Sequence, residues 1–266
     1  MAASWGILKK DRELMLFPAL SSVAVLLVLL SFAWPLFDRQ TLESLRTASR
    51  DEPFVYAVLF AFYFCNYFVV IFFNAAAMAC ALARMRGNDP TVGFGLRSAW
   101  QRLPQIVGWA LLSSTVGFVL RMIEDRVQVV GRIVAALLGM AWTVTSFLVV
   151  PVLVAEGSGP VDAYRRSVAL LKRSWGEQII GNMGFGVIFI LLSLLPVGAV
   201  ALAMFTGNRI VLDWTLAIAA VCLIVLALVS SALQAIYHVA IYHYAAEGRA
   251  PGGFDEGLLA NAFRRK

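Results

Sequence analysis

Residues 147–182 read FLVVPVLVAEGSGPVDAYRRSVALLKRSWGEQIIGN. An apolar segment ends at Glu156, a basic segment follows, and a second apolar segment begins near Ile179. Weaker copies of the basic segment occur twice more in the chain. Apolar segments joined by short basic connections are typical of membrane proteins with several transmembrane helices. The number and lengths of the apolar segments should therefore predict the fold.

The basic segment has the periodicity of an amphipathic helix. Its apolar residues recur at spacings of three and four, which places them on one face, and its cations lie off that face. Pro160 suits the first position of this helix, and Gly176 suits the residue after its end. The apolar face consists of Val161, Tyr164, Val168, Leu171 and Trp175, and the cations are Arg165, Arg166, Lys172 and Arg173.

Two interpretations of this helix remain open. It could be an elbow that only orients the two flanking spans, or a surface that docks a partner or senses lipid. A basic helix with an apolar face can lie at the membrane interface, where anionic lipid headgroups hold it. If the segment forms a binding site, the candidate residues are Glu156, Arg166, Lys172 and Trp175.

The composition of the whole chain predicts an all-α membrane protein. Of 266 residues, 61% are hydrophobic and 14% are charged, whereas soluble domains are nearer half apolar and about a quarter charged. We expect one transmembrane helix bundle over residues 1–266, ending in a cytoplasmic tail over residues 245–266. Small residues from Ala75 to Ala83 predict that this half of the second span packs inside the bundle. The six predicted spans, each long enough for the hydrocarbon layer, are about 14–37, 54–83, 104–123, 133–155, 179–205 and 214–244.

The distribution of positive charge predicts the orientation of the spans. The amino-terminal head, the second and fourth loops and the tail hold 15 of the 22 Lys and Arg residues. Cytoplasmic loops collect these residues in multi-span proteins, so we expect a protein of the plasma (inner) membrane with both termini in the cytoplasm. Nucleic-acid binding would also explain a net charge of +6. We do not expect it, because the cations are spread over separate loops.

The basic segments after the second, fourth and sixth spans resemble one another. Arg97-Ser98 aligns with Arg166-Ser167, and the third copy lies within residues 253–265. In all three, an alanine, a bulky apolar residue and a cation follow in the same order. This pattern predicts three hairpins, each made of two spans and an interfacial helix. The alternative is that short basic amphipathic segments look alike without being copies.

Motifs in and around the basic segment resemble those of a known family. They are Phe147-x3-Pro151-Val-Leu-x2-Glu156 and Pro160-x-Asp162-Ala163-x2-Arg166-Ser167-x2-Leu170-Leu171-Lys172-x-Ser174-Trp175-Gly176-Glu177. With Ser4-Trp5-Gly6 and Asp11-x-Glu13-Leu14-x3-Pro18 near the amino terminus, they are similar to an uncharacterised family of prokaryotic multi-span membrane proteins. The resemblance implies a six-span helical protein and brings no activity, substrate or catalytic residue.

The chain contains no recognisable catalytic or metal-binding motif. The interiors of the predicted spans lack Asp, Glu, Lys and Arg, which argues against ion- or proton-coupled transport and intramembrane aspartyl chemistry. The HExxH, G-x-S-x-G and phosphate-loop patterns are also missing. The three cysteines lie within spans at spacings that suit neither a disulfide framework nor a metal cluster. We therefore expect no enzyme, no cofactor and no metal.

Neutral polar side chains within the spans are the remaining candidates for a site. Each costs free energy if it is unpaired in hydrocarbon, so we expect each to find a partner in the bundle. They could serve only as contacts between helices, or they could line a polar cavity. These residues are Asn66, Asn74, Asn182, Gln234 and His238.

Two functions fit these observations. The first is a non-enzymatic accessory or scaffold protein whose cytoplasmic interfacial helices bind a partner membrane protein, a second copy of the chain, or lipid. The alternative is a permease-type transport subunit for a neutral or apolar small molecule, with a cavity lined by Asn66, Asn74 and Asn182. An intramembrane enzyme is poorly supported, because no set of nucleophile, base and metal ligands can be assembled.

Overall fold

The computed structural model describes residues 11–34, 53–126, 129–173 and 177–247, together with Ser4, Gly6 and Leu8. Within these ranges the chain forms helices joined by short connections, and no β-strand occurs among them. The elements are the 3-10 helix η1 (Arg12–Met15) and the α-helices α2 (Leu16–Ala33), α4 (Pro53–Met85), α5 (Val92–Gln101), α6 (Leu103–Arg126), α7 (Val129–Thr145), α8 (Val149–Glu156), α9 (Pro160–Arg173), α10 (Glu177–Phe205) and α11 (Arg209–Glu247).

Six helical segments of the described chain are long and apolar enough to cross a membrane. The fourth consists of two helices, α7 and α8, joined by a turn at residues 146–148. The end of the first predicted span, residues 35–37, lies outside the described residues. The segments are Glu13–Ala33, Pro53–Met85, Leu103–Glu124, Gly131–Glu156, Val187–Phe205 and Arg209–Ala246. The predicted all-α, multi-span fold is confirmed.

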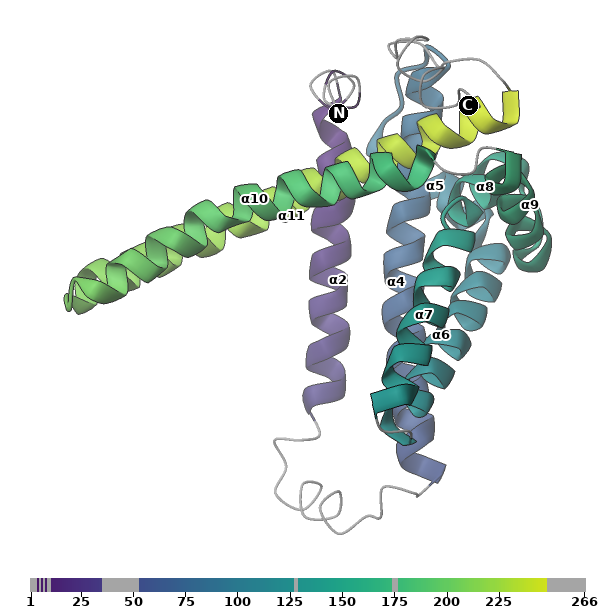
Figure 1. The fold of residues 1–266 in the computed structure, drawn as a ribbon. Helices are drawn as coiled ribbons and strands as arrows, with labels where there is room; N and C mark the ends of the chain where they lie inside the picture. Colours follow the sequence, from purple (N-terminus) through teal and green to yellow (C-terminus); the bar gives the residue numbers. More distant parts are fainter. Residues whose placement is uncertain are drawn as a thin grey trace.

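Helix α4 occupies the centre of the bundle. Helices α2, α4, α6 and α7 lie side by side, and α5, α8 and α9 gather at one end (Figure 1). Helix α4 contacts α2, α5, α6, α8 and α11. All nine residues from Ala75 to Ala83 are buried, because small side chains let neighbouring helices approach closely. The prediction that this half of the second span packs inside the bundle is confirmed.

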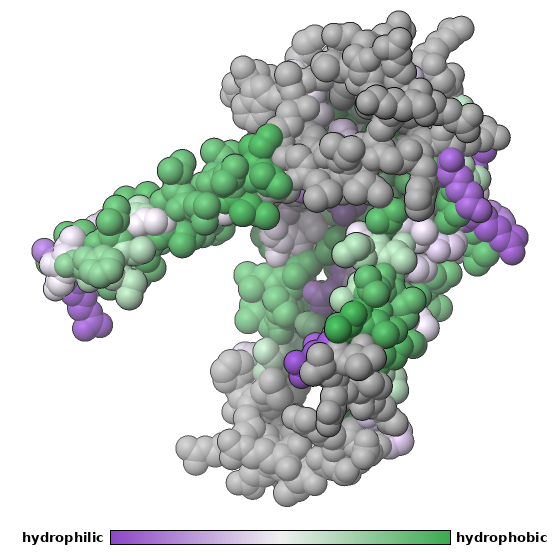
Figure 2. Space-filling model, in the orientation of Figure 1, coloured by the Kyte–Doolittle hydropathy of each residue, from purple (hydrophilic) through white to green (hydrophobic). Residues whose placement is uncertain are grey.

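The hairpin of α10 and α11 leaves the bundle at a steep angle (Figure 1). The chain turns between them at Gly207, whose φ is +66°, and the Asn208 Oδ1 atom accepts a hydrogen bond from the Ile210 N–H at 3.0 Å. The far part of the hairpin exposes large apolar side chains around most of its circumference, as between Ile190 and Val197 (Figure 2). A helix with such a surface is stable only in hydrocarbon or against protein, so the far part of the hairpin requires one of these around it.

Candidate functional site

Polar contacts between distant parts of the chain concentrate at one end of the bundle. This region, called the elbow end below, consists of α5, α8, α9 and the adjoining ends of α4, α6 and α11 (Figure 1). It includes the two interfacial helices predicted after the second and fourth spans, α5 and α9. We describe α9 first because the sequence motifs are concentrated there.

The fourth span is interrupted just before Pro151. Proline has no N–H, and its ring crowds the carbonyl group four residues earlier, which here belongs to Phe147. Residues 146–148 accordingly form a turn, and the Val149 N–H donates to the Ser146 carbonyl at 3.0 Å instead of to the Thr145 carbonyl. The interruption leaves the Leu148 N–H and the Thr145 carbonyl without their usual helical partners.

Ser167 of α9 satisfies both of these backbone groups. Its Oγ atom accepts a hydrogen bond from the Leu148 N–H at 3.2 Å and donates to the Thr145 carbonyl at 2.7 Å. The side chain is fully buried. One hydroxyl group therefore satisfies both free backbone groups of the fourth span and fixes the position of α9 along that span.

Tyr164, one turn before Ser167, adds an aromatic contact between α9 and the fourth span. Its ring stacks on Trp142 at a centroid distance of 5.3 Å, and Trp142 stacks on Trp109 at 5.4 Å. The Tyr164 hydroxyl group donates to Thr145 Oγ1 at 3.1 Å. Stacked rings bury large apolar areas in a specific geometry, so they join α6, α7 and α9 as one unit.

Glu156, the last residue of α8, connects α9 and α11. Its Oε1 atom accepts hydrogen bonds from Arg166 Nε at 3.2 Å and from the Tyr242 hydroxyl group at 3.1 Å. The structure thus brings together two of the predicted binding residues, Glu156 and Arg166. Lys172 is exposed on α9 with no polar contact among the described residues, and Trp175 lies outside them.

The buried face of α9 differs from its predicted apolar stripe. The stripe residue Val161 is 49% exposed, and Tyr164 and Val168 are only half-buried. The buried residues of α9 are Ala163, Ser167, Leu170 and Leu171. Small and polar side chains belong to the buried face because α9 approaches a helix interruption that needs a hydroxyl group there.

Gly157 ends α8 in a conformation that other residues rarely adopt. Its φ is +67°, and its N–H donates to the Leu153 carbonyl at 3.1 Å, as in a left-handed helix cap. The Arg102 guanidinium group lies against it, so that a Cβ atom built on Gly157 would be 2.2 Å from Arg102 Nη1. The glycine thereby makes room for a cation from another helix.

Replacing Gly157 with alanine should destabilise the protein and displace Arg102. The left-handed backbone costs an L-residue about 1–2 kcal/mol, and the new methyl group pushes the guanidinium group away. Gly207→Ala is the matched control, because Gly207 has φ +66° and no atom within 4 Å of the added Cβ. Thermal unfolding in detergent should show a larger loss for Gly157→Ala. Equal losses would mean that the contact with Arg102 contributes nothing.

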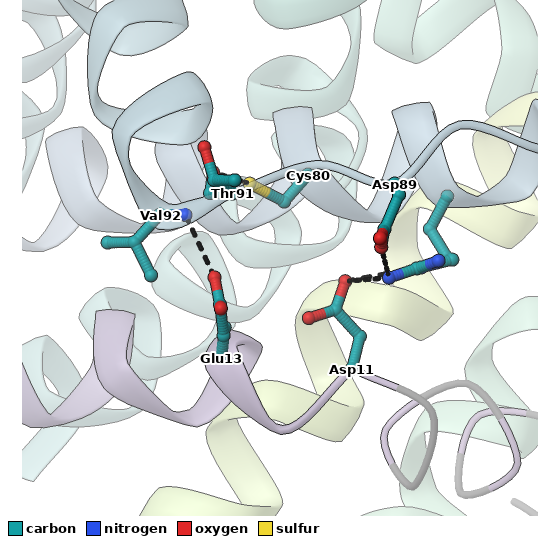
Figure 3. A network of polar contacts seen from close by, with 7 residues as sticks. Asp11, Glu13, Cys80, Asp89, Thr91 and Val92 are labelled. Carbon is teal, nitrogen blue, oxygen red and sulfur yellow. Dashed lines mark hydrogen bonds and ion pairs between the residues drawn. The ribbon is translucent and has the colours of Figure 1, made fainter.

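The other interfacial helix, α5, and the turn before it contact the amino-terminal segment through an arginine. These two interfacial helices, α5 and α9, are called the elbows below. Arg84, near the end of α4, donates from Nε and Nη2 to Asp11 Oδ2 at 3.2 and 3.1 Å, and its Nη2 also contacts Asp89 Oδ1 (Figure 3). The Asp11 side chain is almost completely buried. Buried carboxylates require such a charged partner, so this pair fixes residue 11 against the turn between α4 and α5.

Two further contacts hold the start of α5. Glu13 Oε2 accepts a hydrogen bond from the Val92 N–H at 3.1 Å, and Cys80 Sγ contacts the Thr91 carbonyl at 3.4 Å (Figure 3). A carboxylate at a helix amino terminus satisfies a free N–H and interacts favourably with the helix dipole. Both elbows are therefore fixed by residues from other parts of the chain.

The two elbows do not bury the positions that the sequence aligns. Helix α5 buries Gly95 and Ala99, and α9 buries Ala163, Ser167, Leu170 and Leu171. The Arg-Ser motifs pair the buried Ser167 with Ser98, which is only half-buried. The third copy lies outside the described residues, so the three-hairpin repeat stays a prediction.

The asparagines proposed to line a cavity lie on α4 and α10. The Asn66 amide group donates to the Phe62 carbonyl of its own helix at 2.8 Å. Asn74 is half-buried, and the side chain of Asn182 is outside the described part of the chain. The shared cavity therefore stays a prediction.

Gln234 and His238 lie one turn apart on α11. The Gln234 amide group donates to Ser230 Oγ at 3.0 Å on the same helix. The His238 ring lies 4.1 Å from the Phe147 ring, between centroids, and its buried Nε2 atom has no hydrogen-bond partner among the described residues. No group of three potential metal ligands occurs in that part of the chain.

Sequence reasoning missed the structural roles of several residues at the elbow end. Ser167 was visible only as part of the repeated Arg-Ser pair, and Tyr164 only as part of the apolar stripe. Tyr242 and Arg102 come from helices distant in sequence from their contacts with Glu156 and Gly157. Pro151 could have indicated the role of Ser167 from the sequence, because a proline within a span leaves backbone groups that need another hydrogen-bond partner.

Comparison with known proteins gives one match. The model described as "Family of unknown function (DUF6159)" matches residues 54–253, which confirms the resemblance to an uncharacterised family. The amino-terminal motifs lie before the matched residues. No curated protein and no solved structure matches the chain.

Proposed function

Because the chain belongs to the DUF6159 family of unknown function, we propose its function from the geometry of the elbow end. The protein is an accessory component of the plasma membrane that catalyses no reaction. Its elbow end and both termini face the cytoplasm, where the elbow end binds an acidic segment of a partner membrane protein. The charge distribution along the sequence supports this orientation.

The hydrogen bonds that hold α9 against the bundle are the observation that carries this proposal. Ser167 and Arg166 bond α9 to the fourth span, and Glu156 of that span also accepts a hydrogen bond from Tyr242 of the sixth span, so the backbone of α9 is held in place. A surface that is already ordered loses little conformational entropy when a partner binds. A helix that served only as a connection would not need three side chains, Tyr164, Arg166 and Ser167, to bond it to the fourth span.

The exposed side chains of the two elbows favour an acidic partner. Helix α9 presents Arg165 and Lys172, and the nearest acid to Arg165 is the exposed Asp162 at 3.8 Å. Helix α5 presents Arg97 and the 67% exposed Trp100. Arginine and tryptophan are enriched among residues that dominate protein–protein binding energy, and complementary charge directs association.

The permease alternative has weaker support. Of the three asparagines proposed to line its cavity, Asn66 makes its described hydrogen bond within its own helix, and the intramembrane Gln234 does the same. Such bonds satisfy amide groups that a transported molecule would otherwise use.

Affinity purification from native membranes tests the docking proposal. The wild-type protein should recover a partner that the Arg165→Gln/Lys172→Gln double variant recovers in much smaller amounts, at least about fivefold less given roughly 0.5 kcal/mol for each exposed ionic contact. Arg209→Gln, at the far end of the α10–α11 hairpin, is the control and should recover the wild-type amount. Identical recovery by wild type and double variant would refute the proposal.

A further inference from the structure

A pocket of ≈ 220 Å³ lies between the end of α4, helix α5 and the end of α8. Its wall combines apolar side chains, most of them from the ends of the spans, with polar side chains. The apolar part includes Leu82, Ala83 and Val154, and the polar part includes Arg86, Asn88, Gln101 and Arg102. None of these residues belongs to the outward face of α9 proposed to dock a partner.

The pocket carries two positive charges without a described carboxylate partner. Neither Arg86 nor Arg102 makes an ion pair or a side-chain hydrogen bond within the described residues. The carboxylates described at the elbow end are engaged elsewhere. Asp11 and Asp89 contact Arg84, Glu13 accepts from Val92, Glu156 accepts from Arg166 and Tyr242, and Asp162 lies 3.8 Å from Arg165. Two guanidinium groups near one cavity repel each other unless an anion lies between them.

The hydrogen-bonding groups of the pocket suit an anion. Each guanidinium group offers several N–H donors in a planar fork that matches phosphate oxygens, and the Asn88 and Gln101 amides add neutral donors. The Ser98 hydroxyl group also lines the pocket but already donates to the Phe94 carbonyl at 2.8 Å. The Arg102 guanidinium group lies against Gly157, at the end of α8 that borders the pocket.

The position of the pocket indicates which anion it accepts. It lies where the second and fourth spans end, so its apolar wall continues towards the hydrocarbon and its cations lie at headgroup level. The cavity is smaller than the roughly 300–1,000 Å³ of pockets that enclose whole drug-sized ligands. It suits a phosphate-bearing headgroup whose acyl chains remain outside.

We propose that this pocket binds the phosphate group of an anionic phospholipid through Arg86 and Arg102. The inference rests on the proposed function only in placing the elbow end at the cytoplasmic surface of the membrane. It assigns lipid binding to the α4–α5–α8 pocket and leaves the partner protein to the outward faces of α5 and α9.

Native mass spectrometry of the full chain in a neutral detergent tests this assignment, with phosphatidylglycerol, phosphatidylcholine and inorganic phosphate as the added probes. We expect the wild-type protein to retain one phosphatidylglycerol in preference to phosphatidylcholine. Arg86→Gln/Arg102→Gln should weaken phosphatidylglycerol binding about tenfold or more, because each lost charged hydrogen bond is large enough for such a change. Arg209→Gln, exposed at the far end of the α10–α11 hairpin and outside the pocket, should bind as the wild type does.

A second variant keeps the test decisive if the double variant does not fold. Arg86 is exposed at the end of α4, so Arg86→Gln alone should preserve the fold and still weaken binding measurably. Unchanged phosphatidylglycerol binding in a folded Arg86→Gln protein would overturn the proposal. Inorganic phosphate binding as tightly as the lipid would overturn the lipid assignment in favour of a free anion. The Arg165→Gln/Lys172→Gln variant should lose the partner protein but retain the lipid, so the two proposals can fail separately.

Discussion

Replacing Ser167 with alanine is expected to lower the melting temperature of the detergent-solubilised protein markedly. The change removes the only hydroxyl group that contacts the Leu148 N–H and the Thr145 carbonyl within the described structure. Leaving one buried backbone group unsatisfied costs about 1–3 kcal/mol, and hydrocarbon around the span supplies no replacement partner. Both groups lie in the interruption of the fourth span, so α9 should also become less firmly attached.

Ser98→Ala is the matched control for this change. Ser98 occupies the aligned position of the other elbow, but its hydroxyl group donates to the Phe94 carbonyl of its own helix. That carbonyl can keep its ordinary helical hydrogen bond without the side chain. We expect Ser98→Ala to change the melting temperature little. If both variants melted alike, Ser167 would have no special role in the joint between α7, α8 and α9.

Gly95→Ala is expected to destabilise the protein although alanine is the better helix former. A Cβ atom at position 95 would lie 2.6 Å from Phe17 Cζ, 2.7 Å from Cys80 Sγ and 2.8 Å from the Ala76 carbonyl oxygen. The carbonyl belongs to the backbone of α4 and the Phe17 ring is almost fully buried, so neither can move without wider rearrangement. Overpacking of this kind costs about 1–3 kcal/mol.

Gly93→Ala, two residues earlier on α5, isolates the steric effect. Its added Cβ would meet only Thr91 Oγ1, at 3.8 Å. This control should be neutral or stabilising by up to about 1 kcal/mol, which is the difference in helix propensity between the two residues. Thermal unfolding of both variants in detergent provides the comparison. A Gly95→Ala protein as stable as Gly93→Ala would contradict the close packing of α5 against α2 and α4.

The number of spans and the start of α9 could be predicted because each depends on residues that are close in sequence. Apolar runs of sufficient length require hydrocarbon whatever the rest of the chain does, and Pro160 is the first residue of α9, as its restricted φ favours. The alanines from Ala75 to Ala83 similarly indicated a buried helix face. Hydropathy and local backbone preference were enough for these features.

The buried face of α9 and the direction of the α10–α11 hairpin could not be predicted in this way. Periodicity gives the apolar side of a helix, yet Val161 on that side is exposed and Ser167 off that side is buried. The reason lies in the turn before Pro151, which leaves two backbone groups that only a polar side chain can satisfy. An apolar helix is equally compatible with several packing directions, so its sequence does not specify one.

The sequence by itself determined that this is an all-α, multi-span membrane protein, with short basic helices between its spans. Only the tertiary structure decided which residues form its candidate sites. These are the contacts of α9 through Ser167, those of Glu156 with Arg166 and Tyr242, and the pocket containing Arg86 and Arg102. Hydrophobic burial depends on how apolar each segment is, and that can be read locally. Hydrogen bonds and ion pairs depend on atoms within about 3 Å of one another, and those atoms come from helices far apart in the chain.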